Sequence, residues 1–137
     1  MLIFLDSGSL TEIEKYAADS RVSGFTTNPT LIKQAGVTDY RSFAKAVMGL
    51  IGEKEVSFEV LADDEPTMYA QAQEISSWGP KVYVKIPIMH ADGSSTMGLV
   101  QKLSSEGVRV NVTAVMTTKQ IREVFEAING DHILSIF

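Results

Sequence analysis

Short apolar runs alternate with amphipathic stretches along the whole chain, without a low-complexity segment or a linker. The runs have the length and β-branched content of strands, and the stretches between them repeat apolar residues at helical spacing. The predicted strands are 2–6, 22–26, 55–61, 81–86, 108–112 and 132–137. Strands that alternate with helices form βαβ units and a parallel sheet. The pattern therefore predicts an α/β protein, doubly wound or barrel-like, with five strand–helix units and a sixth strand.

Local signals mark the ends and faces of the predicted helices. Ser9 with Glu12, and Thr117 with Gln120, have the spacing of a capping box. The loop 90–93 is expected to be a solvent-exposed connection. Two helices carry an apolar stripe that is expected to face the core, made of Phe43, Val47, Leu50 and Ile51 in one and of Ile121, Val124, Phe125 and Ile128 in the other.

Lys85 lies inside the apolar run Val82-Tyr83-Val84-Lys85-Ile86-Pro87, which is typical of a strand buried on both faces. Lysine is seldom fully buried without a partner, and burial disfavours an ammonium group. A lysine kept neutral in this way is an amine nucleophile that forms Schiff bases with carbonyl compounds. The alternative is a lysine on an exposed strand edge, or one whose ammonium extends from the strand end to water.

The composition of the chain argues against several kinds of site and partner. The 137 residues, 45% hydrophobic and 21% charged, suit one globular domain over 1–137. The chain has no cysteine and only two well-separated histidines, so neither a metal nor a disulfide framework is expected. A net charge of -5 argues against nucleic acid and anionic membranes as partners. Without a signal peptide or an apolar run of about eighteen residues, the sequence predicts a cytoplasmic protein.

Polar residues gather where the predicted strands end. They are Asp6, Thr27 and Asn28, Glu59, Lys85, Asn111 and Thr113, and Ser135. Barrel enzymes place their catalytic groups at the carboxyl ends of strands. Each residue alone is more often a turn or cap residue, but two acids, a buried lysine and several amides and hydroxyls together indicate an active site. No strand is followed by G-x-G-x-x-G or a P-loop, so nucleotide binding has no support.

Specific motifs accompany these positions along the whole chain, in order. They are Phe4-Leu5-Asp6, the run Gly24 to Ile32 with Thr-Thr-Asn-Pro, Ser57-Phe58-Glu59-Val60, Val84-Lys85-Ile86-Pro87 and the run Glu106 to Thr113. The chain thereby resembles transaldolases, and more narrowly the small transaldolases and fructose-6-phosphate aldolases. The resemblance implies a TIM-type (β/α) barrel and Schiff-base chemistry that needs no metal or other cofactor.

The resemblance also implies a role for each residue. Lys85 forms the Schiff base, Glu59 activates a water for proton transfer, Asp6 is the second acid/base and Thr113 helps to hold the water. Four further residues bind the sugar: Thr26, Asn28, Asn111 and Ser135. The implied reaction transfers a dihydroxyacetone unit from a ketose phosphate to an aldose phosphate, and a glutamate at position 59 favours transaldolase. Two alternatives stay open: an aldolase that works without an acceptor sugar, and a non-catalytic remnant that self-assembles.

The match with a full barrel is incomplete. A complete barrel has eight strand–helix units in about 200 residues or more, whereas this sequence supplies five units and a sixth strand. Around the sixth strand the family motif is Ser-Pro-Phe followed by arginine, and here Ser135-Ile136-Phe137 is found. We therefore expect weaker phosphate binding. Open sheet edges expose unpaired backbone groups, so a homo-oligomer that completes these edges is expected.

Overall fold

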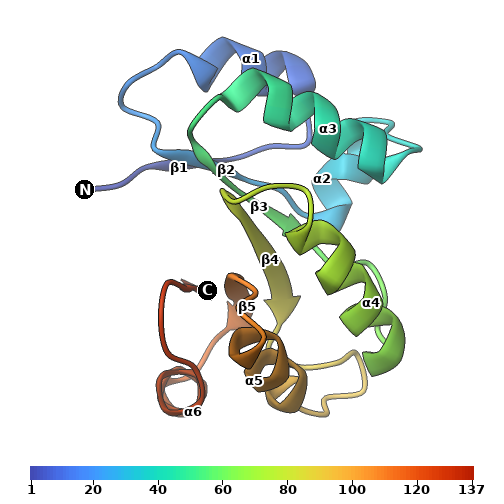
Figure 1. Cartoon of the computed structure of the whole chain (residues 1–137), viewed down its shortest axis with the longest axis vertical. Coiled ribbons are helices and arrows are strands. Elements are labelled where there is room, and N and C mark those ends of the chain that lie inside the picture. Colours follow the sequence, from blue (N-terminus) through green and yellow to red (C-terminus); the bar gives the residue numbers. More distant parts are fainter. The chain divides into compact units, whose positions relative to one another are not determined.

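In the computed structural model, which describes residues 1–137, each strand is separated from the next by a helix, or by the two helices α2 and α3 between β2 and β3 (Figure 1). The strands are β1 (Phe4–Asp6), β2 (Gly24–Thr26), β3 (Glu55–Glu59), β4 (Val82–Pro87), β5 (Val110–Val115) and β6 (Ile133–Ile136). The helices are α1 (Leu10–Ala17), α2 (Pro29–Gln34), α3 (Tyr40–Ile51), α4 (Glu65–Ser76), α5 (Met97–Ser105) and α6 (Thr118–Ala127). The chain divides into two compact units: unit 1 contains residues 1–59 and 78–82, and unit 2 contains residues 60–77 and 83–137.

Within each unit the strands are parallel and follow one another in chain order. In unit 1, β1 pairs with β2 and β2 with β3. In unit 2, β4 pairs with β5 and β5 with β6. Parallel strands need a crossover between them, and the helices supply it. This confirms the predicted fold class, an incomplete parallel β/α barrel of five strand–helix units and a sixth strand.

Buried apolar side chains form the core of each unit. In unit 1, Phe25, Val56 and Phe58 are fully buried on adjacent strands. Phe58 also meets Trp78 edge to face, with ring centroids 5.3 Å apart. In unit 2 the residues 83–86, part of the run that the sequence predicted to be buried on both faces, are buried at every position.

The two predicted capping boxes have different outcomes. At α6 both halves are present: Thr117 Oγ1 accepts from Gln120 N–H, and the Gln120 side chain accepts from Thr117 N–H. At α1 only the first half forms, because Ser9 Oγ accepts from Glu12 N–H while the Glu12 carboxylate accepts from Ser7 Oγ at 2.5 Å. A closer hydroxyl thus replaces the backbone group that the motif predicts.

The apolar stripe of α6 is only partly buried, which corrects the prediction. Val124 is buried, whereas Phe125 is 73% exposed. A stripe identifies the apolar side of a helix, but another element must cover it. The helix packs on α5 and β5, and these contacts bury Val124 and leave the side that carries Phe125 in solvent.

The fifth strand is longer than predicted and is irregular at its end. It extends to Val115, and its pairing with β6 shifts between Val112 and Val115. Ala114 has a positive φ of 59°, which is uncommon outside glycine and breaks the regular pleat. Sequence alternation does not reveal such a bulge, so the predicted end at 112 was too early.

Candidate active site

Three of the predicted residues meet at the carboxyl ends of β1 and β2 in unit 1. Asp6 is the register partner of Thr26, so both side chains lie on one face of the sheet. The Asp6 carboxylate accepts hydrogen bonds from Thr26 Oγ1 at 2.8 Å and from Asn28 Nδ2 at 3.2 Å. Two donors on separate oxygens fix the plane of the carboxylate.

Asn28 is itself held in place by the next helix. It is the N-cap of α2, and its Oδ1 accepts from Leu31 N–H at 3.0 Å, with Pro29 in the first turn. The amide therefore has one orientation, with its oxygen on the helix and its nitrogen on Asp6. Asn28 thus caps a helix in this structure, and sugar binding by Asn28 stays a prediction.

Glu59 closes β3, two residues after Ser57, which is the register partner of Thr26. Tyr40 Oη donates to the Glu59 carbonyl oxygen at 3.0 Å, and Thr27 Oγ1 donates to that of Ser57 at 3.0 Å. Burial raises the pKa of Tyr40, so its hydroxyl remains a proton donor. The backbone that carries Glu59 is therefore fixed by side-chain donors.

Lys85 occupies the centre of β4 in unit 2 and is only 6% exposed. The alternative of a lysine on an exposed strand edge is therefore wrong. Its register partner is Asn111, and two residues further Pro87 pairs with Thr113. Register partners on parallel strands point to the same face, so Lys85, Asn111 and Thr113 share one side of the sheet.

Asn111 and Ser135 are joined by a direct hydrogen bond. Asn111 is fully buried, and its Oδ1 accepts from Ser135 Oγ on β6 at 2.7 Å. This bond turns the amide oxygen towards β6, so the amide NH₂ group points away from Ser135. Ser135 and Asn111 are both predicted sugar-binding residues of unit 2, and in this structure Ser135 donates a hydrogen bond to Asn111.

The loop after β4 is exposed at 91–93, as the sequence predicted, whereas His90 is half-buried. Met89 and Ser95 form an antiparallel bridge, and the His90 side chain is only 12% exposed. Asp63 Oδ1 lies 3.4 Å from His90 Nδ1 and accepts from Ala91 N–H at 3.0 Å. The expectation of a solvent-exposed connection is therefore confirmed for 91–93, and His90 alone departs from it, because Asp63 in the loop after β3 lies beside its ring.

A polar cluster lies at the opposite, amino-terminal ends of β4 to β6. Buried Tyr83 donates to Asp131 Oδ1 at 2.8 Å, and Arg109 donates to Asp131 Oδ2 at 2.6 Å and to the Tyr83 hydroxyl. The Arg109 guanidinium also covers the Tyr83 ring at 3.9 Å. Hydrogen bonds from Tyr83 and then Arg109 lower the pKa of Asp131. This end of a barrel contributes to stability rather than to catalysis.

We expect the Asp131 carboxylate to make folding sensitive to acid. A lowered folded-state pKa contributes stability that is complete above the unfolded pKa, about 4, and is lost as pH falls through the folded value. Asp131→Asn should therefore flatten the fall in urea midpoint below about pH 4. Glu126→Gln, at an exposed position on α6, is the control and should keep the wild-type curve. An Asp131→Asn curve that follows the wild type would contradict the assignment.

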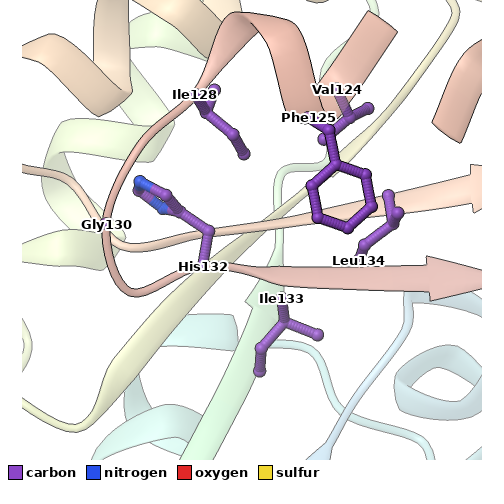
Figure 2. Close-up of a pocket in the computed structure, with 7 residues that line it drawn as sticks. All are labelled: Val124, Phe125, Ile128, Gly130, His132, Ile133 and Leu134. Carbon is purple, nitrogen blue, oxygen red and sulfur yellow. The ribbon is translucent and has the colours of Figure 1, made fainter. Parts of the chain in front are cut away.

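One hollow of the surface lies apart from the predicted catalytic positions. A cavity of about 280 Å³ lies between α6 and β6 and is lined mainly by apolar side chains (Figure 2). None of the predicted site residues lines it.

None of the helices is both long enough and apolar enough to cross a bilayer.

Comparison with known proteins gives the same family as the sequence motifs. The family model described as transaldolase/fructose-6-phosphate aldolase matches residues 3–137. A probable transaldolase of Dehalococcoides mccartyi is 43% identical over 120 residues, which are 88% of this chain and 54% of that protein. One from Desulforudis audaxviator is 35% identical over 137 residues, 100% of this chain and 60% of that protein. This chain thus spans little more than half the length of these relatives.

Proposed function

Because the chain belongs to the transaldolase/fructose-6-phosphate aldolase family, we propose that it transfers a dihydroxyacetone unit from a ketose phosphate to an aldose phosphate through a Schiff base on Lys85. The observation that carries the proposal is the burial of Lys85 beside Asn111 and Thr113, on a strand within the family match. A lysine shielded from water is the form of this residue that suits attack on a carbonyl. Cytoplasmic carbohydrate metabolism is the proposed setting.

The proposed reaction has two halves. The neutral amine of Lys85 adds to the ketose carbonyl, and loss of water gives an iminium ion. The iminium accepts the electron pair of the adjacent C–C bond when the neighbouring hydroxyl loses its proton, so that an aldose phosphate leaves and an enamine stays on Lys85. The enamine then attacks the aldehyde of the acceptor, and water releases the new ketose phosphate from the lysine.

The proton transfers are assigned to the two carboxylates of unit 1. Asp6, fixed by Thr26 and Asn28, is proposed to exchange the proton of the sugar hydroxyl. Glu59 is proposed to activate the water that forms and hydrolyses the imine, with Thr113 as a hydrogen-bond partner of that water. The Asn111 amide is proposed to donate to a sugar hydroxyl, in the orientation that Ser135 imposes.

The experiment uses fructose 6-phosphate as donor, with and without erythrose 4-phosphate as acceptor. Sedoheptulose 7-phosphate formed only with the acceptor supports transaldolase activity. Release of dihydroxyacetone without an acceptor supports the second candidate, the aldolase activity that the family description also names. If borohydride traps no adduct on the wild-type chain and neither product forms, the chain is a non-catalytic remnant and the proposal fails.

We also propose that the chain self-associates through the exposed apolar side chains of α6 and β6. Phe125, Ile136 and Phe137 are largely exposed, and β6 pairs with β5 alone. Such an edge and patch favour association. Phe125→Ser should therefore lower the average mass measured by light scattering after size exclusion. Leu61→Ser, a matched exposed position in the loop between β3 and α4, should not. A wild-type chain that is monomeric at micromolar concentration would contradict this proposal.

A further inference from the structure

His132 joins several elements of unit 2 through both of its ring nitrogens. Nδ1 lies 3.2 Å from the backbone nitrogen of Val110 at the start of β5 and accepts its N–H. Nε2 lies 2.9 Å from the Asn129 carbonyl oxygen, in the turn after α6, and 3.0 Å from Ser104 Oγ on α5. Figure 2 shows the ring beside Gly130 in that turn.

These partners determine the form of the ring. A carbonyl oxygen only accepts hydrogen bonds, so Nε2 carries a hydrogen and donates to Asn129. A backbone N–H only donates, so Nδ1 offers a lone pair to Val110. Only the neutral imidazole satisfies both neighbours, since a protonated ring would place an N–H against the N–H of Val110.

The strand that follows His132 is held mainly by its neighbour β5. β6 has four residues, none of them fully buried, and lies at the edge of the sheet. Its pairing with β5 is irregular beyond Val112, on the side away from His132. Short edge strands with little buried surface open at low free-energy cost. The same strand carries Ser135, which fixes the Asn111 amide.

We propose that neutral His132 is a positioning residue of the active site. It fastens the start of β6 to β5, and through β6 it keeps Ser135 bonded to Asn111. Protonation removes the acceptor of Val110, loosens β6 and releases the orientation of the Asn111 amide. The part of this inference that concerns Asn111 rests on the proposed function, whereas the fastening of β6 does not.

The charges around the ring are few. Asp131 precedes His132 and interacts with it electrostatically, but its carboxylate is bound by Tyr83 and Arg109. His132 lines the cavity between α6 and β6, where the apolar side chains of Val124 and Ile128 are its neighbours on the α6 side. On the α5 side its neighbour is the Ser104 hydroxyl. Because Asp131 is already bonded, it does not replace the lost contact with Val110 when the ring is protonated.

Hydrogen exchange of the wild-type chain tests the fastening directly. Protection factors of Val110 and the β6 amides would be measured by NMR between about pH 5 and 8, together with the titration of both histidine rings. Loss of one hydrogen bond predicts a drop in protection of about fivefold to tenfold as His132 is protonated. The Val84 amide, bonded to the Arg109 carbonyl at 2.8 Å on the β4 side, should not change.

Three variants make the test specific. His132→Asn supplies an oxygen acceptor that does not titrate, so protection of Val110 should become independent of pH. His132→Phe lacks the acceptor and should give low protection throughout. His90→Asn removes the other histidine of the chain and should keep the wild-type dependence. Flat wild-type protection, or an unchanged pH dependence in His132→Asn, would overturn the fastening.

The link to the site needs a second measurement. Borohydride trapping is measured at increasing concentrations of fructose 6-phosphate, and the half-saturating concentration is determined. As pH falls and His132 becomes protonated, this concentration should rise in the wild type relative to His132→Asn. Comparison of the two proteins at equal pH removes the pH effects that they share. A constant ratio would overturn the positioning role while leaving the Schiff base intact. Absence of any adduct would instead refute the proposed function, and hydrogen exchange alone would then decide the fastening.

Discussion

Replacing Lys85 with methionine should abolish the borohydride-trapped adduct with dihydroxyacetone or fructose 6-phosphate. The side chain is buried in β4, and methionine has a similar length, no charge and good tolerance of buried sites. The variant therefore removes the amine and keeps the packing. Mass spectrometry of the intact chain would measure the adduct, and a thermal unfolding curve would show that the fold is retained.

Lys81→Met is the matched control for this result. Lys81 lies four residues before Lys85, an even spacing that puts both side chains on the same face of an extended chain. It is more exposed than Lys85. Its variant should give the wild-type yield of adduct, with peptide mapping that places the modification on Lys85. An adduct that survives in Lys85→Met, or that maps to another lysine, would refute the Schiff-base assignment.

Replacing Asp6 with asparagine should lower the cleavage of fructose 6-phosphate by about 10² to 10⁴, the range that general acid–base groups contribute. Asparagine keeps the size of the side chain and an acceptor oxygen for the Thr26 hydroxyl, but it cannot take up the proton of a sugar hydroxyl. The Lys85 adduct with dihydroxyacetone should still form. The measurement compares the release of glyceraldehyde 3-phosphate with the yield of trapped adduct.

Asp19→Asn provides the control for Asp6. Asp19 lies after α1 and is bound to Arg21, which lowers the pKa of Asp19 to about 2. Its loss should leave both cleavage and adduct formation unchanged. Cleavage by Asp6→Asn at the wild-type rate would remove Asp6 from the mechanism, and a parallel loss of the adduct would place Asp6 in imine formation instead.

Much of the candidate site follows from the alternation of side chains along each strand and from where each strand ends. The alternation in β4 places Lys85 on a defined face, and parallel pairing with β5 brings Asn111 and Thr113 to that face. In unit 1 the same reasoning brings Asp6 and Thr26 together. These are regular patterns of period two, and they hold as long as the strands pair in register.

The sequence did not predict contacts that depend on loops and on the edge strand. The Asp63 contact with His90 joins two loops, and the His132 contacts join a turn to a helix and a neighbouring strand. The bond between Ser135 and Asn111 follows an irregular strand pair. No short-range pattern encodes these distances, because each depends on turn geometry or on a bulge.

The sequence by itself determined the order of the strands and helices, the burial of the run around Lys85 and the family to which the chain belongs. These follow from hydrophobic period, cap residues and motifs, which act over a few neighbouring residues. Only the tertiary structure decided that Asn28 holds Asp6, that Ser135 holds Asn111 and that Phe125 is exposed. Such contacts join residues far apart in the chain, and they form only when strand register and helix packing bring specific atoms within hydrogen-bonding distance.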